Sequence, residues 1–111
     1  MPKIIITKGF PIPKNYAGLT IIPCIIFIKK EYHDDKQLIN HENIHSKQLL
    51  ELAIIPQYIL YAIFYTINII KYKFNHDKAY RNIPFEKEAY TNQNNLNYTN
   101  QRKHYEWIKY I

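Results

Sequence analysis

The segment His41-Glu42-Asn43-Ile44-His45 contains two histidines four residues apart, within a stretch of helical periodicity. On a helix these two side chains lie on one face, about one turn or ~6 Å apart along the axis, so both can reach one metal ion. Glu42 follows the first histidine, where a carboxylate can take a proton from a water held by the metal. The pattern predicts a Zn²⁺ site with His41 and His45 as ligands. The alternative is a surface helix with two solvated histidines.

The predicted helix covers residues 36–53. Asp34 or Asp35 precedes it as an N-cap, and Pro56 would end or kink it. Gln48 falls on the same helical face as the two histidines. It is therefore a candidate hydrogen-bond partner for a metal ligand, although an ordinary surface glutamine would give the same pattern.

Apolar, β-branched runs at 3–8 and 19–30 predict short N-terminal strands. Pro23 interrupts the second run, which places that strand at a sheet edge or bends it. We expect residues 25–28 to form a free edge beside the histidine helix, where an extended peptide could add as a strand; core packing of the isoleucines is the alternative. Cys24 is the only cysteine, so no intramolecular disulfide forms, and we expect its thiol to be buried and inert.

Residues 52–70 carry no charged side chain over nineteen positions, which is close to the length of a membrane span. A helix is predicted over 56–72, with polar and tyrosine side chains on one face and the isoleucines, together with Leu60 and Phe64, on the other. This pattern favours a half-buried helix of a soluble domain. Membrane association through 52–70 is the alternative. The N-terminal apolar run is too short for a signal peptide, so a cytoplasmic chain is expected, with the inner face of the membrane as the second option.

Residues 73–83 are predicted to form a connecting loop, and Pro84 suits the first position of a helix. The C-terminal part, 84–110, is expected to be helical, with a break in the asparagine-rich segment 92–100. The 111 residues suit a single domain with one modest core. The predicted fold is α+β and mostly α, with short strands in residues 1–30 followed by three to four helices.

A catalytic zinc site usually has three protein ligands and one open position. Glu86 and Glu88, near the start of the C-terminal helix, are the candidates for the third ligand, and His76 or Asp77 is a weaker choice. Acidic residues are also favoured in a first helical turn without any metal, because they interact with the helix dipole.

The second motif is Pro84-Phe85-Glu86-Lys87-Glu88-Ala89-Tyr90. With both motifs, over roughly residues 19–110, the chain resembles the gluzincin-like zincin metallopeptidases and is similar to small uncharacterised bacterial proteins that carry the same pair. The resemblance implies His41 and His45 as zinc ligands, Glu42 as general base, and a glutamate from a downstream helix as third ligand.

The family patterns leave that glutamate open between two positions. The pattern E-x-x-A maps onto Glu86 and Ala89, but Tyr90 stands where the family has Asp or Asn. The pattern E-x-x-x-D maps onto Glu88, with Asn92 in place of the aspartate. We prefer Glu86.

The predicted function is zinc-dependent hydrolysis of peptide bonds in a peptide or protein substrate. Candidates for stabilising the oxyanion are Tyr80, Tyr90 and His104. Two other hypotheses stand beside it: a non-catalytic zinc-stabilised module that binds a partner, and a membrane-associated protein. The net charge of +6 comes from scattered lysines without a basic stripe or an RNA-binding motif, so no nucleic-acid partner is expected.

Overall fold

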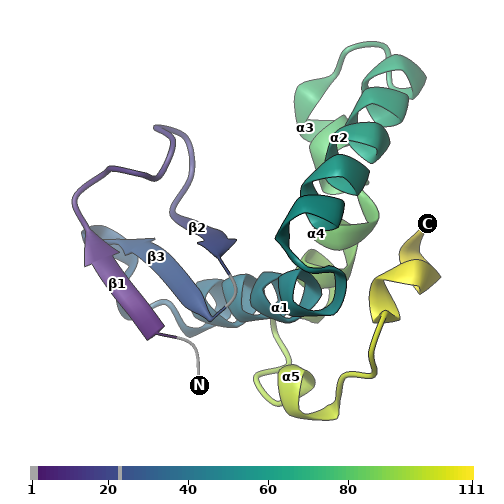
Figure 1. Ribbon diagram of the computed structural model, residues 1–111. Helices are drawn as coiled ribbons and strands as arrows, with labels where there is room; N and C mark the ends of the chain where they lie inside the picture. The colour runs from purple at the N-terminus through teal and green to yellow at the C-terminus, as the bar shows by residue number, and fades with distance from the viewer. Residues whose placement is uncertain (1–2, 23) are drawn as a thin grey trace.

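The computed structural model describes residues 3–22 and 24–111, so that Pro23 lies outside the described residues. The fold is mixed α+β and mostly helical, as predicted, with an N-terminal sheet followed by helices (Figure 1). The sheet has three strands in the order β1-β3-β2. Their bounds are β1 Lys3–Thr7, β2 Gly18–Ile22 and β3 Ile25–Lys29. β3 pairs in parallel with β1 and antiparallel with β2.

The central position of β3 corrects one prediction. Residues 25–28 are not a free edge, because Ile26 and Ile28 are fully buried and the strand is paired on both sides. The strand at the sheet edge that contacts the histidine helix is β2.

Cys24 also differs from expectation: its side chain is exposed, on a residue with φ of 68°, so the prediction of a buried thiol is wrong.

Five α-helices follow the sheet, together with two short 3₁₀ helices at Lys30–Tyr32 and Glu106–Tyr110. The α-helices are α1 Lys36–Leu52, α2 Ile54–Lys71, α3 His76–Arg81, α4 Pro84–Asn92 and α5 Tyr98–Gln101. The predicted helices at 36–53 and 56–72 are thus present within two residues. The predicted loop at 73–83 is wrong, because it contains α3. The break in the asparagine-rich segment is confirmed, but the chain beyond it forms only α5 and a 3₁₀ turn.

Local sequence explains where the helices begin. The Asp35 side chain accepts a hydrogen bond from the backbone N–H of Leu38 at 3.0 Å and caps α1. Asn75 caps α3 in the same way, through the N–H of Lys78 at 3.2 Å. Pro84 opens α4. Between α1 and α2 the chain turns at Ala53, which has a φ of 60°.

Helix α1 is the centre of the fold, because the sheet covers one side of it and α4 packs against another. Ile26 and Ile28 of β3 are fully buried, as is Ile44 of α1. A second core cluster forms around Phe85 at the start of α4, whose ring lies 4.8 Å from that of Trp107. Burial on both sides fixes α1 rigidly and with it the two histidines.

Helix α2 extends away from the body of the domain beside α3 (Figure 1). By length and composition it is the one helix of the described chain that could cross a membrane. The prediction of a half-buried helix agrees with the structure, because one face of α2 is buried or partly buried and the opposite face is exposed. Leu60, Tyr61, Phe64 and Tyr65 of the inward face pack against the cluster around Phe85, and most isoleucines turn outward. Two hydrogen bonds add to this packing: Tyr61 donates to Glu86, and Asn68 donates to the Ala79 carbonyl.

Candidate metal centre

Helices α1 and α4 bring His41, His45 and Glu86 together. The Nε2 atoms of the two histidines lie 3.1 Å apart. Glu86 Oε1 lies 3.3 Å from His41 Nε2 and 3.1 Å from His45 Nε2. His41 and Glu86 are only 5% and 4% exposed. Two nitrogens and one carboxylate therefore converge on one point from two helices.

The outer nitrogen of each imidazole is held by a glutamine. His41 Nδ1 lies 2.8 Å from Gln93 Oε1, and His45 Nδ1 lies 2.9 Å from Gln48 Oε1. The orientation of Gln48 is fixed from its other end, because its Nε2 donates to the Phe85 carbonyl and to Glu88. An amide oxygen only accepts, so each Nδ1 carries a hydrogen, and in the neutral ring each Nε2 has a lone pair for a metal ion. The hydrogen-bond contact predicted between Gln48 and a histidine is present, with His45 Nδ1–H donating to the Gln48 amide oxygen.

The electrostatics of the cluster call for a positive charge. Burial alone would lower the pKa of His45, but the facing Glu86 carboxylate outweighs it and raises that pKa to about 10. Burial disfavours the charged form of Glu86, yet the neighbouring histidines hold its pKa well below the usual range. Either a proton on His45 or a cation must balance the buried carboxylate. Two imidazole nitrogens and one carboxylate oxygen are a ligand set that fits Zn²⁺.

Glu42 lies next to this cluster, with a carboxylate oxygen within 4.8 Å of the nearest ligand atoms of His41 and His45. Its Oε1 accepts a hydrogen bond from Thr20 Oγ1 at 2.8 Å, which connects it to β2. Gly18 leaves room for the side chain, because a Cβ there would lie 3.3 Å from Glu42 Cγ and 3.1 Å from Ile28 Cδ1. The sheet edge thus positions Glu42.

A cavity of about 320 Å³ opens beside the cluster. Glu42, His45 and Glu86 contribute polar atoms to its wall. The rest is mostly apolar or aromatic: Pro13, Tyr16, Gly18, Leu19, Thr20, Leu49, Gln57, Tyr58, Tyr61 and Tyr80. The Tyr61 hydroxyl donates to Glu86 Oε2 at 3.1 Å. Gln57 is 4% exposed, and its Oε1 has no hydrogen-bond partner within the described residues.

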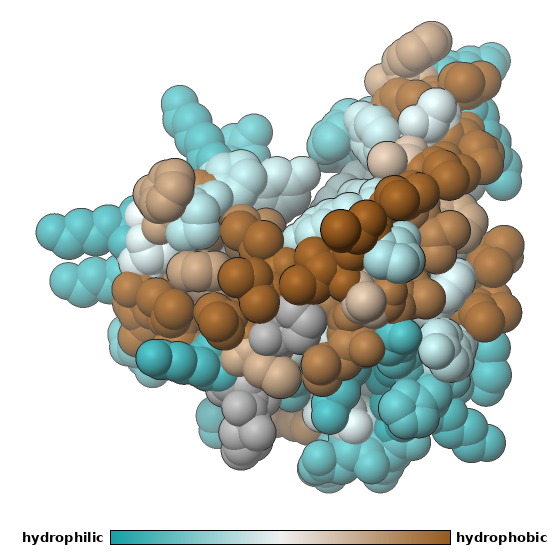
Figure 2. Space-filling view, viewed as in Figure 1, coloured by the Kyte–Doolittle hydropathy of each residue, from teal (hydrophilic) through white to brown (hydrophobic). Residues whose placement is uncertain are grey.

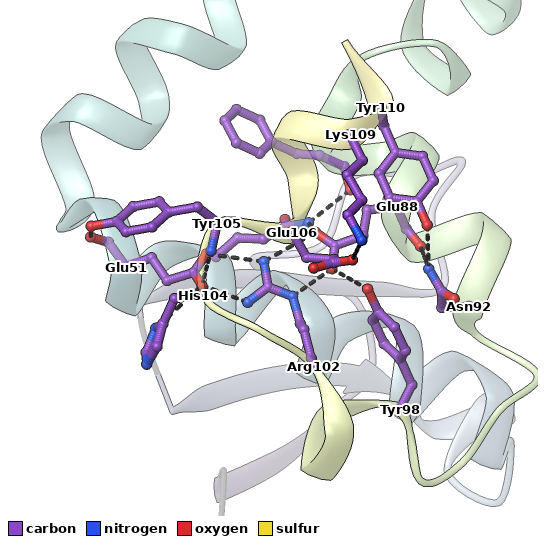
Figure 3. Close-up of polar contacts among 12 residues, drawn as sticks. Glu51, Glu88, Asn92, Tyr98, Arg102, His104, Tyr105, Glu106, Lys109 and Tyr110 are labelled. Carbon is purple, nitrogen blue, oxygen red and sulfur yellow. Dashed lines mark hydrogen bonds and ion pairs between the residues drawn. The ribbon is translucent and has the colours of Figure 1, made fainter.

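Glu88 does not reach the histidines. Its side chain is fully buried and hydrogen-bonds to Tyr98, Arg102 and Gln48 (Figure 3). Arg102 also makes two hydrogen bonds to Glu51, at 2.7 and 2.9 Å. The arginine therefore joins two buried carboxylates, and Gln48 links this network to His45. Glu88, the alternative candidate for the third ligand, therefore contacts the site only through Gln48.

The remaining candidates divide into two groups. Tyr80 lines the cavity, and the ring of Tyr90 packs edge-on against His41 at 4.5 Å between centroids. His104 is 89% exposed and lies beside Glu51, so its prediction as an oxyanion partner is wrong. His76 contacts the Tyr65 hydroxyl at 2.9 Å and does not join the cluster.

Several residues of the site were not identified from the sequence. Gln93 is 52 positions beyond the histidine that it contacts, in an asparagine-rich segment without any regular pattern. No sequence pattern marked Thr20 or Gly18 as site residues either. Tyr61 lies on the tyrosine and amide face of α2, and a tyrosine there, on a helix without charges, is a signal for a carboxylate partner.

Comparison with known proteins adds no assignment: no family, no curated protein and no solved structure matches this chain.

Proposed function

We propose that this protein is a zinc-dependent peptidase. The observation that carries the proposal is the convergence of His41 Nε2, His45 Nε2 and the Glu86 carboxylate beside Glu42, at the wall of a cavity. His41, His45 and Glu86 would hold the ion. A bound zinc ion would lower the pKa of a water molecule toward ~7 and polarise the peptide carbonyl.

Glu42 is the general base of the proposed reaction. Its carboxylate accepts the proton of the attacking water and passes it to the leaving amine. The hydrogen bond from Thr20 orients this carboxylate, and the absence of a side chain at Gly18 lets it keep that position. The base is thus positioned by β2 and not by its own helix alone.

Tyr80 is the proposed donor to the developing oxyanion, because it lines the cavity and the Tyr61 hydroxyl already donates to Glu86. Burial, followed by the charge of Glu86, raises the pKa of the Tyr80 hydroxyl well above its usual value. This hydroxyl therefore keeps its proton at neutral pH and remains able to donate. Tyr90, which packs against His41, would act by holding that ring in place.

The substrate is proposed to lie extended along β2. This edge strand lines the cavity at Gly18, Leu19 and Thr20, so a peptide paired with it would pass in front of Glu42. Tyr58 of α2 donates to the Ile21 carbonyl at 2.7 Å and limits the pairing at the far end of the strand. The apolar wall suits a hydrophobic side chain.

The test is zinc content and peptide hydrolysis, measured together on wild type and Glu42→Gln. We expect about one zinc per chain in both proteins and cleavage of a mixed peptide library by wild type only. Thr20→Val is a milder variant that should keep zinc and reduce turnover, since it removes only the orienting hydroxyl. Zinc in a folded protein that cleaves no peptide or protein would contradict the peptidase and leave a zinc-stabilised module.

A further inference from the structure

A row of isoleucines runs along the outer face of α2. These side chains are between 48% and 71% exposed, and we call them the isoleucine stripe: Ile55, Ile59, Ile63, Ile67 and Ile70. Figure 2 shows this face as a brown ridge that follows α2 and continues toward the sheet. Water-exposed apolar surface of this extent is typical of an interaction site.

The outward direction of the stripe is fixed by the opposite face of the helix. Tyr61 donates to Glu86, and Asn68 Nδ2 donates to the Ala79 carbonyl at 3.1 Å. Gln57 is buried against the domain. Rotating α2 to bury the isoleucines would break both hydrogen bonds and expose this polar face. The stripe is therefore a property of the folded domain.

The charges around α2 indicate what covers the stripe. The helix carries no charge before Lys71, and exposed Lys71, Lys73 and Lys78 follow at its C-terminal end and just beyond, with Asp77 as the one acidic residue in that stretch. Phe74, between the lysines, is 78% exposed. Isoleucines inserted among acyl chains, lysines at lipid phosphates and an aromatic ring at the boundary form the pattern of an interfacial helix.

A helix lying in the membrane plane fits these contacts better than one that spans the bilayer. A spanning helix has no water to satisfy polar side chains, whereas Gln57, Tyr61 and Asn68 already face the protein. In the plane, only the isoleucine stripe meets the lipid and the polar face keeps its partners.

We propose that α2 docks the protein on an anionic membrane surface, with the isoleucine stripe inserted and Lys71 and Lys73 at the headgroups. The proposal is independent of zinc and of catalysis. Because Tyr61 on the inner face of the same helix reaches Glu86, docking would hold the candidate metal centre roughly one helix diameter, about 10 Å, from the lipid.

The test is flotation of the full chain with vesicles of phosphatidylcholine alone or mixed with phosphatidylglycerol. We expect strong binding to the anionic vesicles, weakened by salt. Ile59→Gln/Ile63→Gln should lower partitioning at least about tenfold, because two half-exposed isoleucines no longer enter the acyl region. Lys71→Gln and Lys73→Gln should each cost roughly fivefold, on anionic vesicles only.

The matched control is Leu96→Gln/Ile108→Gln, which removes two residues of 50% and 52% exposure outside the stripe. It should bind vesicles like wild type, and chelation of zinc should change nothing. Failure of the folded wild type to bind, or equal loss in both double variants, would overturn the proposal. So would a dimer in sedimentation that Ile59→Gln/Ile63→Gln dissociates, without vesicle binding, because a second copy would then cover the stripe.

Discussion

Replacing Arg102 with methionine should destabilise the protein more than any other single charge removal outside the metal site. The side chain of Arg102 is 3% exposed and joins Glu51 and Glu88, whose side chains are 2% and 0% exposed. Arg102→Met would leave two carboxylates buried without their cation. Removing one partner of a buried ion pair costs about 3–5 kcal/mol, and two stranded carboxylates place this variant at the upper end. Such a loss is a large part of the ~5–15 kcal/mol that stabilises a typical domain.

The assay is denaturation by urea, followed by circular dichroism with a zinc chelator present, so that metal binding does not contribute. Lys109→Met is the control: it breaks the pair with Glu106, where the lysine is 69% exposed, and should change stability little. The triple variant Arg102→Met/Glu51→Gln/Glu88→Gln should recover much of the loss, because neutral amides are less costly to bury. Stability of Arg102→Met within about 1 kcal/mol of wild type would refute the buried network.

Two further predictions concern the site itself. Gln48→Leu and Gln93→Leu should each weaken zinc binding about 10–100-fold in a folded protein, measured by chelator competition, because the imidazoles lose their orienting acceptors; unchanged affinity would exclude this role. Zinc binding at pH 6.5 should release about one proton, because the pKa of His45 is about 10 without metal and zinc requires the neutral ring. Calorimetry in buffers of different ionisation enthalpy measures this release. The zinc affinity should therefore weaken as pH falls, and pH-independent binding would contradict the prediction.

The parts of the fold that depend on nearby residues could be predicted. Helix α1 follows from the Asp35 cap and the helical spacing of its apolar residues. Helix α3 was missed, although Asn75 is an equally good cap, because a helix of six residues has too little periodicity to stand out. The central place of β3 depends on pairing with β1 at the other end of the N-terminal segment, and no local pattern encodes that pairing.

Periodicity separated the tyrosines and amides of α2 from its isoleucines, but it placed Leu60 and Phe64 with the isoleucines, although both pack inward against the cluster around Phe85. It also gave no information on which face turns inward, because that choice depends on distant segments, which supply this cluster and the hydrogen-bond acceptors of Glu86 and Ala79. The same limit applies to the third ligand position. Glu86 and Glu88 are two residues apart and differ only in what α4 presents to α1. Only the packing of the two helices separates the glutamate beside the histidines from the one beside Arg102.

The most direct measurement is the zinc content of purified wild type beside Glu86→Gln and Glu88→Gln, with folding checked by circular dichroism. The proposed centre predicts about one zinc per chain in wild type and in Glu88→Gln, and loss of zinc in Glu86→Gln. Loss of zinc in Glu88→Gln alone would show that Glu88, and not Glu86, is the third ligand. No zinc in well-folded wild type, even after zinc is added, would contradict the metal centre itself.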